Sequence, residues 1–104
     1  MPTLNEALQY MGIDYADAMV SANVQRAIDT AKRILKGAVG DDVFDLMPDD
    51  ERAKELVLMY ADDLYSERGV ALKVNAATRK LAADMELQVK LELRRLREAV
   101  ANGV

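Results

Sequence analysis

Residues 85–93 carry apolar and polar side chains in strict alternation, Met-Glu-Leu-Gln-Val-Lys-Leu-Glu-Leu. A period of two is typical of a strand with one buried face. The residue types instead favour a helix, because Leu, Glu, Gln, Lys and Met are good helix formers. We expect a helix in the free chain and leave open a strand within an assembly.

As a helix, this C-terminal segment presents apolar side chains on two sides. One side carries Leu81, Met85, Val89, Leu93, Leu96 and Val100, and the other carries Leu87 and Leu91. A short terminal segment cannot easily bury both sides within its own small domain. Surplus apolar surface of this kind indicates a binding partner.

Apolar residues at helical spacing predict helices over residues 4–11, 17–36 and 49–67, and a fourth helix from Asn75 onward. Thr3 and Glu6 have the spacing of a capping box, and Asp49 is the expected N-cap of the third helix. Gly12, Gly37 and Gly69 follow the first three helices. Residues 38–48 are expected to form a loop, part of which packs onto the core through Val43, Phe44, Leu46 and Met47. The alternative is that these apolar residues are exposed for contact with a partner. The predicted fold is therefore all-α. It is a small bundle of about four helices over residues 1–84 with an extended C-terminal interaction arm over residues 85–104.

Composition excludes several kinds of chemistry for this 104-residue chain, which contains neither Cys nor His. Disulfides, the usual zinc sites, thiol nucleophiles and histidine bases are thereby ruled out. No apolar run approaches the roughly 18–20 residues of a membrane span, and the first residues lack the pattern of a signal peptide. We therefore expect no membrane contact and a cytoplasmic origin.

Charge is distributed unevenly along the chain, whose net charge is −4. Residues 1–72 have a net charge of −7, and residues 73–104 have a net charge of +3. Such polarity is expected either of a solvated acidic loop or of a subunit whose two ends meet different neighbours. The residues predicted for subunit–subunit or axial contacts are Asp41, Asp42, Phe44, Asp45, Asp49, Asp50, Arg79 and Lys80.

Neither catalysis nor nucleic-acid recognition is well supported by the motifs. Asp62 and Asp63 are adjacent, but neighbours on a helix point about 100° apart and do not converge on one metal ion. Asp41 and Asp42, in a turn, could hold a cation only weakly. We therefore predict no enzymatic activity, no metal and no cofactor. The basic cluster of Lys90, Arg94, Arg95 and Arg97 is interrupted by acidic residues and contains no aromatic residue. This pattern favours a solvated helix end or an ion-pairing interface over a DNA-binding surface.

Five short segments form an ordered set of motifs along the chain. They are residues 12–14 (Gly-Ile-Asp), 35–40 (Leu-Lys-Gly-Ala-Val-Gly), 50–56 (Asp-Glu-Arg-Ala-Lys-Glu-Leu), 64–69 (Leu-Tyr-Ser-Glu-Arg-Gly) and 87–92 (Leu-Gln-Val-Lys-Leu-Glu). In order and spacing this set resembles the small head–tail connector proteins of long-tailed double-stranded DNA phages. Together the five segments extend over nearly the whole chain. Leu64 stands where many members of that family carry a tryptophan.

The resemblance implies a subunit of the virion neck, assembled in the host cytoplasm into a ring of about twelve copies beneath the portal protein. Such a ring extends the DNA channel, lets DNA pass without specific recognition, and offers a docking surface to a stopper or tail-completion protein. The C-terminal arm would then bind the portal, either as a helix in a groove or as an added strand. The residues predicted for this arm are Met85, Leu87, Val89, Leu91, Leu93, Arg94, Arg95, Leu96 and Arg97. The alternative is a dimeric helical regulatory or adaptor protein that could bind nucleic acid.

Overall fold

The computed structural model describes residues 1–66 and 76–103, which form helices and contain no strand. The helices are α1 (Leu4–Tyr10), α2 (Ala18–Val39), α3 (Val43–Leu46), α4 (Glu51–Ser66) and α5 (Ala76–Ala101). The all-α prediction is confirmed, and residues 85–93 are helical in the single chain. The predicted helix end at Gly69 and the predicted cap at Asn75 lie outside the described residues.

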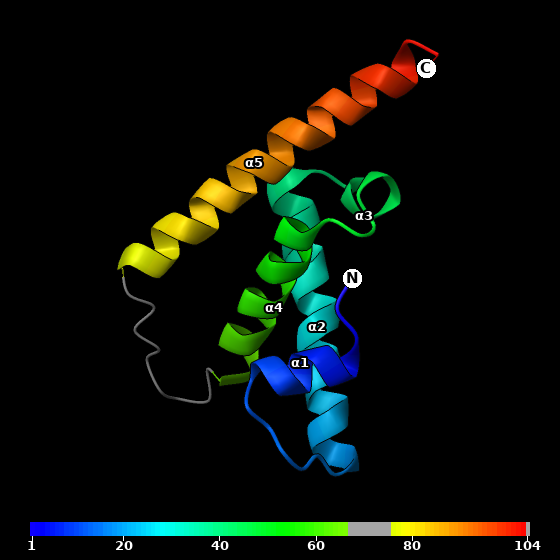
Figure 1. Cartoon of the computed structure of the whole chain (residues 1–104). Coiled ribbons are helices and arrows are strands. Elements are labelled where there is room, and N and C mark those ends of the chain that lie inside the picture. The colour runs from blue at the N-terminus through cyan, green and yellow to red at the C-terminus, as the bar shows by residue number, and fades with distance from the viewer. Residues whose placement is uncertain (67–75, 104) are drawn as a thin grey trace.

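The core lies between α2 and α4, which run antiparallel and side by side along the length of the bundle (Figure 1). Every third or fourth residue of α2 between Val24 and Val39 is buried, as expected of a helix with one apolar face. Several of the buried side chains are alanines, which leave room for a neighbouring backbone to approach. The core alanines of these two helices are Ala27, Ala31, Ala53 and Ala61.

The short helix α1 packs against α2 and α4, and a capping box and a glycine mark its two ends. The Thr3 hydroxyl accepts a hydrogen bond from the Glu6 backbone, and the Glu6 carboxylate accepts one from the Thr3 backbone, which completes the predicted capping box. Gly12 has a φ of 73°, the left-handed conformation predicted for the residue that follows this helix. An ion pair between Lys54 and Glu6 joins α1 to α4.

Helix α2 continues past Gly37, where the sequence analysis ended it, and stops instead before Gly40. A glycine inside a helix costs only about 1 kcal/mol, and the added turn buries Val39. Gly40 has a φ of 144°, which side chains disfavour, so it is the residue that ends the helix. The prediction at Gly37 was therefore wrong by one turn.

The loop predicted over residues 38–48 begins only at Gly40, because residues 38 and 39 belong to α2. Part of it packs onto the core, as predicted, and it includes the one-turn helix α3, which the sequence did not lead us to expect. Val43 and Met47 are buried, and Phe44 is partly buried with the Lys36 ammonium 5.9 Å from the centre of its ring. The segment thus closes one end of the bundle.

The acidic residues before α4 do not share one role. The Asp50 carboxylate accepts hydrogen bonds from the backbone amides of Arg52 and Ala53, at 2.9 and 3.0 Å, and therefore caps the helix. The sequence analysis assigned this cap to Asp49, which is exposed. Burial, the largest single influence, raises the pKa of Asp50, but hydrogen bonds from Arg52 and Ala53 together hold that pKa below its ordinary value.

Helix α5 crosses the ends of α2 and α4 obliquely, and both of its ends extend beyond the other helices (Figure 1). The molecule is accordingly elongated, with extents of 48 × 31 × 18 Å and a radius of gyration of 14.9 Å. A compact chain of this length would have a radius of gyration of about 13 Å. Only the middle of α5 is therefore seated on the bundle.

Candidate functional site

The inner side of α5 is part of the chain's own core. Val89 and Leu93 have no exposed surface, and Met85 and Leu96 are partly buried against the same cluster. Four of the residues predicted to bind a partner thus contact the bundle in this conformation. Removal of residues 85–104 would also remove core side chains, so the predicted arm has to be tested by substitutions on its surface.

An ion pair at the corner between α2 and α3 fixes the C-terminal half of α5. The Arg97 guanidinium donates to both carboxylate oxygens of Asp42, with Nε at 2.8 Å from Oδ2 and 3.1 Å from Oδ1. This hydrogen bonding lowers the pKa of Asp42 from its ordinary value. A Cβ atom built on Gly40 would overlap the Arg97 guanidinium and lie 2.8 Å from a Leu93 methyl carbon. The glycine therefore permits the close approach of α5.

A second polar contact ties α5 to α4. The Tyr60 hydroxyl donates a hydrogen bond to the Glu86 carboxylate. Partial burial raises the pKa of Glu86 from its ordinary value, because desolvation disfavours the charged form. The first half of α5 is thus held by a hydrogen bond and the second half by an ion pair.

The outer side of α5 carries an exposed apolar pair. Leu87 is 56% exposed and Leu91 is 53% exposed, one helical turn apart. Leu81 and Val100, nearer the ends of the helix, are also exposed. Charged side chains surround the pair, and we use the name outer face of α5 for this surface, formed by Lys80, Asp84, Leu87, Leu91, Arg94 and Glu98.

The remaining basic residues predicted for the arm are differently placed. Arg94 is exposed, whereas Arg95 forms an ion pair with Glu92 on the same helix and Arg97 forms the pair with Asp42. Two of the three arginines therefore already face a carboxylate.

The residues predicted for contacts between subunits are not gathered into one surface. Asp41, Asp45, Asp49 and Lys80 are exposed. Asp42, Phe44 and Asp50 contact their own chain, as described above, and the side chain of Arg79 lies outside the described residues. The structure therefore uses part of the acidic segment for internal contacts and leaves part of it free.

Two further apolar side chains are exposed near the start of α2. Tyr15, in the connector before this helix, is 82% exposed, and Met19, in its first turn, is 73% exposed. This end of α2 lies at the opposite end of the bundle from α5 (Figure 1). The sequence analysis did not single out these residues, although Met19 falls outside the apolar stripe of α2 and could have been recognised from that position.

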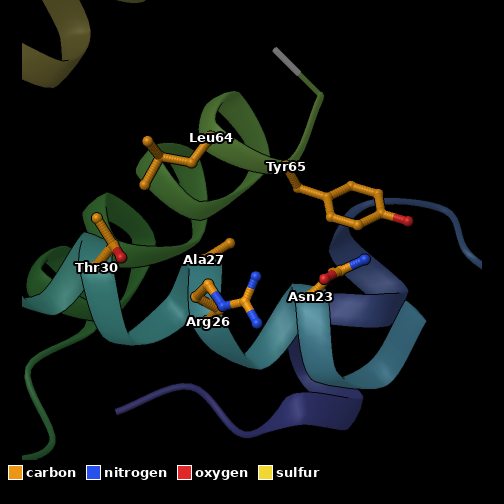
Figure 2. A pocket seen from close by; sticks show the side chains of 6 residues that line it. All are labelled: Asn23, Arg26, Ala27, Thr30, Leu64 and Tyr65. Carbon is orange, nitrogen blue, oxygen red and sulfur yellow. The ribbon is translucent and has the colours of Figure 1, made fainter. Parts of the chain in front are cut away.

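A shallow pocket of about 200 Å³ lies between α2 and the end of α4 (Figure 2). Its lining among the described residues consists of Asn23, Arg26, Ala27, Thr30, Leu64 and Tyr65. Arg26 is the charged member of this set, and the Tyr65 ring stands over the Asn23 side of the opening (Figure 2). No acid–base pair converges there among these side chains.

Among residues 1–66 and 76–103, no three acidic side chains come together in a way that could hold a metal ion. No helix there combines the length and the hydropathy that a membrane crossing requires.

Comparisons with known proteins add no assignment to these observations. No protein-family model, curated protein or solved structure matches the chain. A function for this chain is therefore inferred from the exposed apolar side chains near the start of α2 and on α5, and from the order of the sequence motifs.

Proposed function

We propose that this chain is a structural subunit of a phage head–tail connector, which forms a ring beneath the portal and extends the DNA channel. The observation that carries the proposal is the exposure of unlike apolar side chains at opposite ends of the bundle, near the start of α2 and on the outer face of α5 (Figure 1). A contact between two different patches repeats head to tail and closes into a ring when the rotation permits. In such a ring, Tyr15 and Met19 of one subunit would pack near Leu87 and Leu91 of the next.

The C-terminal part of α5 supplies an axial contact in this proposal. The helix continues beyond the Arg97 anchor, and its last turn extends past α3 into solvent with Val100 62% exposed (Figure 1). A projecting amphipathic helix fits an apolar groove on a partner. We assign the portal protein as the partner for this end, and the acidic segment around Asp41 and Asp45 as the docking surface for a stopper or tail-completion protein.

Electron microscopy of the full chain mixed with portal protein tests the proposal. Rings docked on the portal are expected with the wild-type chain. Met19→Lys should prevent ring growth, while Ala38→Lys, an exposed site near the other end of α2, should not. The proposal is wrong if the wild-type chain neither binds portal nor forms rings at high concentration.

A dimeric adaptor that binds nucleic acid is the second candidate, favoured by exposed Lys90 and Arg94 on α5. The ion pairs of Arg95 and Arg97 with carboxylates reduce the positive charge that DNA phosphates would meet. DNA retardation in a gel, without any ring on the portal, would favour this adaptor over the connector.

A further inference from the structure

From its N-terminal end, the outer face of α5 carries a positive charge, a negative charge, two leucines, a positive charge and a negative charge. From its C-terminal end, the same order is found with every charge reversed. Its members form three pairs, placed two, five and nine residues to either side of Val89: Leu87 with Leu91, Asp84 with Arg94, and Lys80 with Glu98. Because successive residues of an α-helix are rotated by about 100° around its axis, all six residues lie within about 40° of one line along the helix surface. That line is opposite the buried side chain of Val89.

These side chains are free to meet another molecule. The two leucines are more than half exposed, and the four charged residues are exposed as well. Within residues 1–66 and 76–103, none of the ion pairs involves Lys80, Asp84, Arg94 or Glu98. Their charges are therefore available for a complementary surface.

We propose that the outer face of α5 binds the same face of a second copy of this chain, with the two helices antiparallel and a two-fold axis beside Val89. In this arrangement Leu87 packs on Leu91 of the second copy. Asp84 then faces Arg94 of that copy, and Lys80 faces Glu98 of that copy. A two-fold contact repeats each of these pairs, so the surface is complementary to itself.

The charges also select the direction of the pairing. In a parallel arrangement each residue would face its own copy, so Asp84 would oppose Asp84 and Arg94 would oppose Arg94. Like charges placed opposite each other across an interface are repulsive and suppress that alternative. Antiparallel pairing is thus the arrangement in which all four charged positions meet an opposite charge.

The contact is short and should be weak. Residues 80–98 span about 27 Å of helix, and only the leucines contribute apolar surface at its centre. The ion pairs around them are exposed and are screened by salt. We therefore expect a dimer with a dissociation constant on the order of micromolar that weakens as the salt concentration rises.

This pair is a different association from the proposed ring. A two-fold contact closes with two copies and cannot build a ring by itself. The two-fold pair would cover Leu87 and Leu91 in chains that have not yet assembled. A ring or portal contact on that surface would have to displace the second copy. The pair does not depend on the connector function and would form in the isolated chain.

Sedimentation equilibrium of the full chain at low ionic strength measures the pairing. Asp84→Arg and Arg94→Asp each place like charges opposite each other, so each variant alone should dimerise at least tenfold more weakly than the wild type. An equimolar mixture of the two variants should recover the dimer, because each variant offers the charge that the other now requires. The double variant Asp84→Arg/Arg94→Asp should regain self-association for the same reason.

Circular dichroism of each variant separates lost pairing from lost folding. Should one variant unfold, Lys80→Glu and Glu98→Lys apply the same exchange nearer the ends of the face. A wild-type chain that stays monomeric at high concentration would overturn the proposal, as would single variants that dimerise normally or a mixture that gains nothing. Met19→Lys, which should stop ring growth, should leave this dimer intact, so the two proposals can fail independently.

Discussion

Helices α4 and α5 are both amphipathic, but the bundle uses them very differently. Helix α4 has 16 residues and buries Ala53, Leu56, Val57, Leu58 and Ala61. Helix α5 has 26 residues, and among its described side chains only Val89 and Leu93 are buried. Helix α4 therefore packs against its own chain along its length, whereas most of the surface of α5 is left uncovered by its own chain.

The largest expected effect comes from comparing the two sides of α5. Leu93→Ala should lower the free energy of unfolding by about 2–5 kcal/mol, because it leaves a cavity in the core. Leu91→Ala, two residues away on the outer face, should change it by less than about 0.5 kcal/mol. Urea unfolding monitored by circular dichroism at low protein concentration measures both. Equal losses would mean that α5 is not seated through Val89 and Leu93.

The next effect tests how closely α5 approaches the end of α2. Gly40→Ala should destabilise the chain by about 1–3 kcal/mol, because a Cβ there meets Leu93 and Arg97 and because the residue has a positive φ. Gly37→Ala is the matched control, since a Cβ at that helical position has nothing within 4 Å. That control should stabilise the chain by about 0.5–1 kcal/mol. A neutral result at Gly40 would contradict the close contact, and thermal unfolding of both variants supplies the comparison.

Local signals in the sequence were sufficient for the parts of the fold that depend on neighbouring residues. The capping box of Thr3 and Glu6 and the turn at Gly12 were predicted correctly, because each involves residues three to four apart. The close contact at Gly40 involves Leu93 and Arg97 of α5, which lie more than 50 residues further along the chain. Local sequence could not supply that information.

The candidate site was predictable only in part, for a related reason. Alternation over residues 85–93 predicted two apolar sides for α5. Of the side that contains Val89, the four central residues contact the core, whereas Leu81 and Val100 are exposed. The sequence did not show that this side would enter the core or that Leu87 and Leu91 would stay exposed. The Tyr60–Glu86 contact was missed because its residues lie 26 positions apart.

A smaller effect is expected at the start of α4, where two neighbouring aspartates differ in role. Asp50→Ala removes the helix cap and its bonds to Arg52 and Ala53, and should cost about 1 kcal/mol. Asp49→Ala changes an exposed side chain and should stay within about 0.5 kcal/mol of the wild type. Chemical unfolding of the two variants side by side decides the assignment. A larger loss at Asp49 would return the cap to the residue that the sequence favoured.

The smallest effect concerns the two polar anchors of α5, whose pH dependences have opposite signs. Because Arg97 lowers the pKa of Asp42, the stability that this pair contributes is complete above the ordinary pKa of aspartate. That contribution is lost as the pH falls through the lowered pKa of Asp42. Because burial raises the pKa of Glu86, the cost of its charge is complete above that raised pKa and is relieved as the pH falls.

Asp42→Asn should therefore make the acid loss of stability shallower, and Glu86→Gln should make it steeper. Urea midpoints measured from neutral into acid pH test both signs. Curves parallel to the wild type would show that neither anchor is coupled to folding, and added salt should weaken the Asp42 effect first, because that pair is the more exposed.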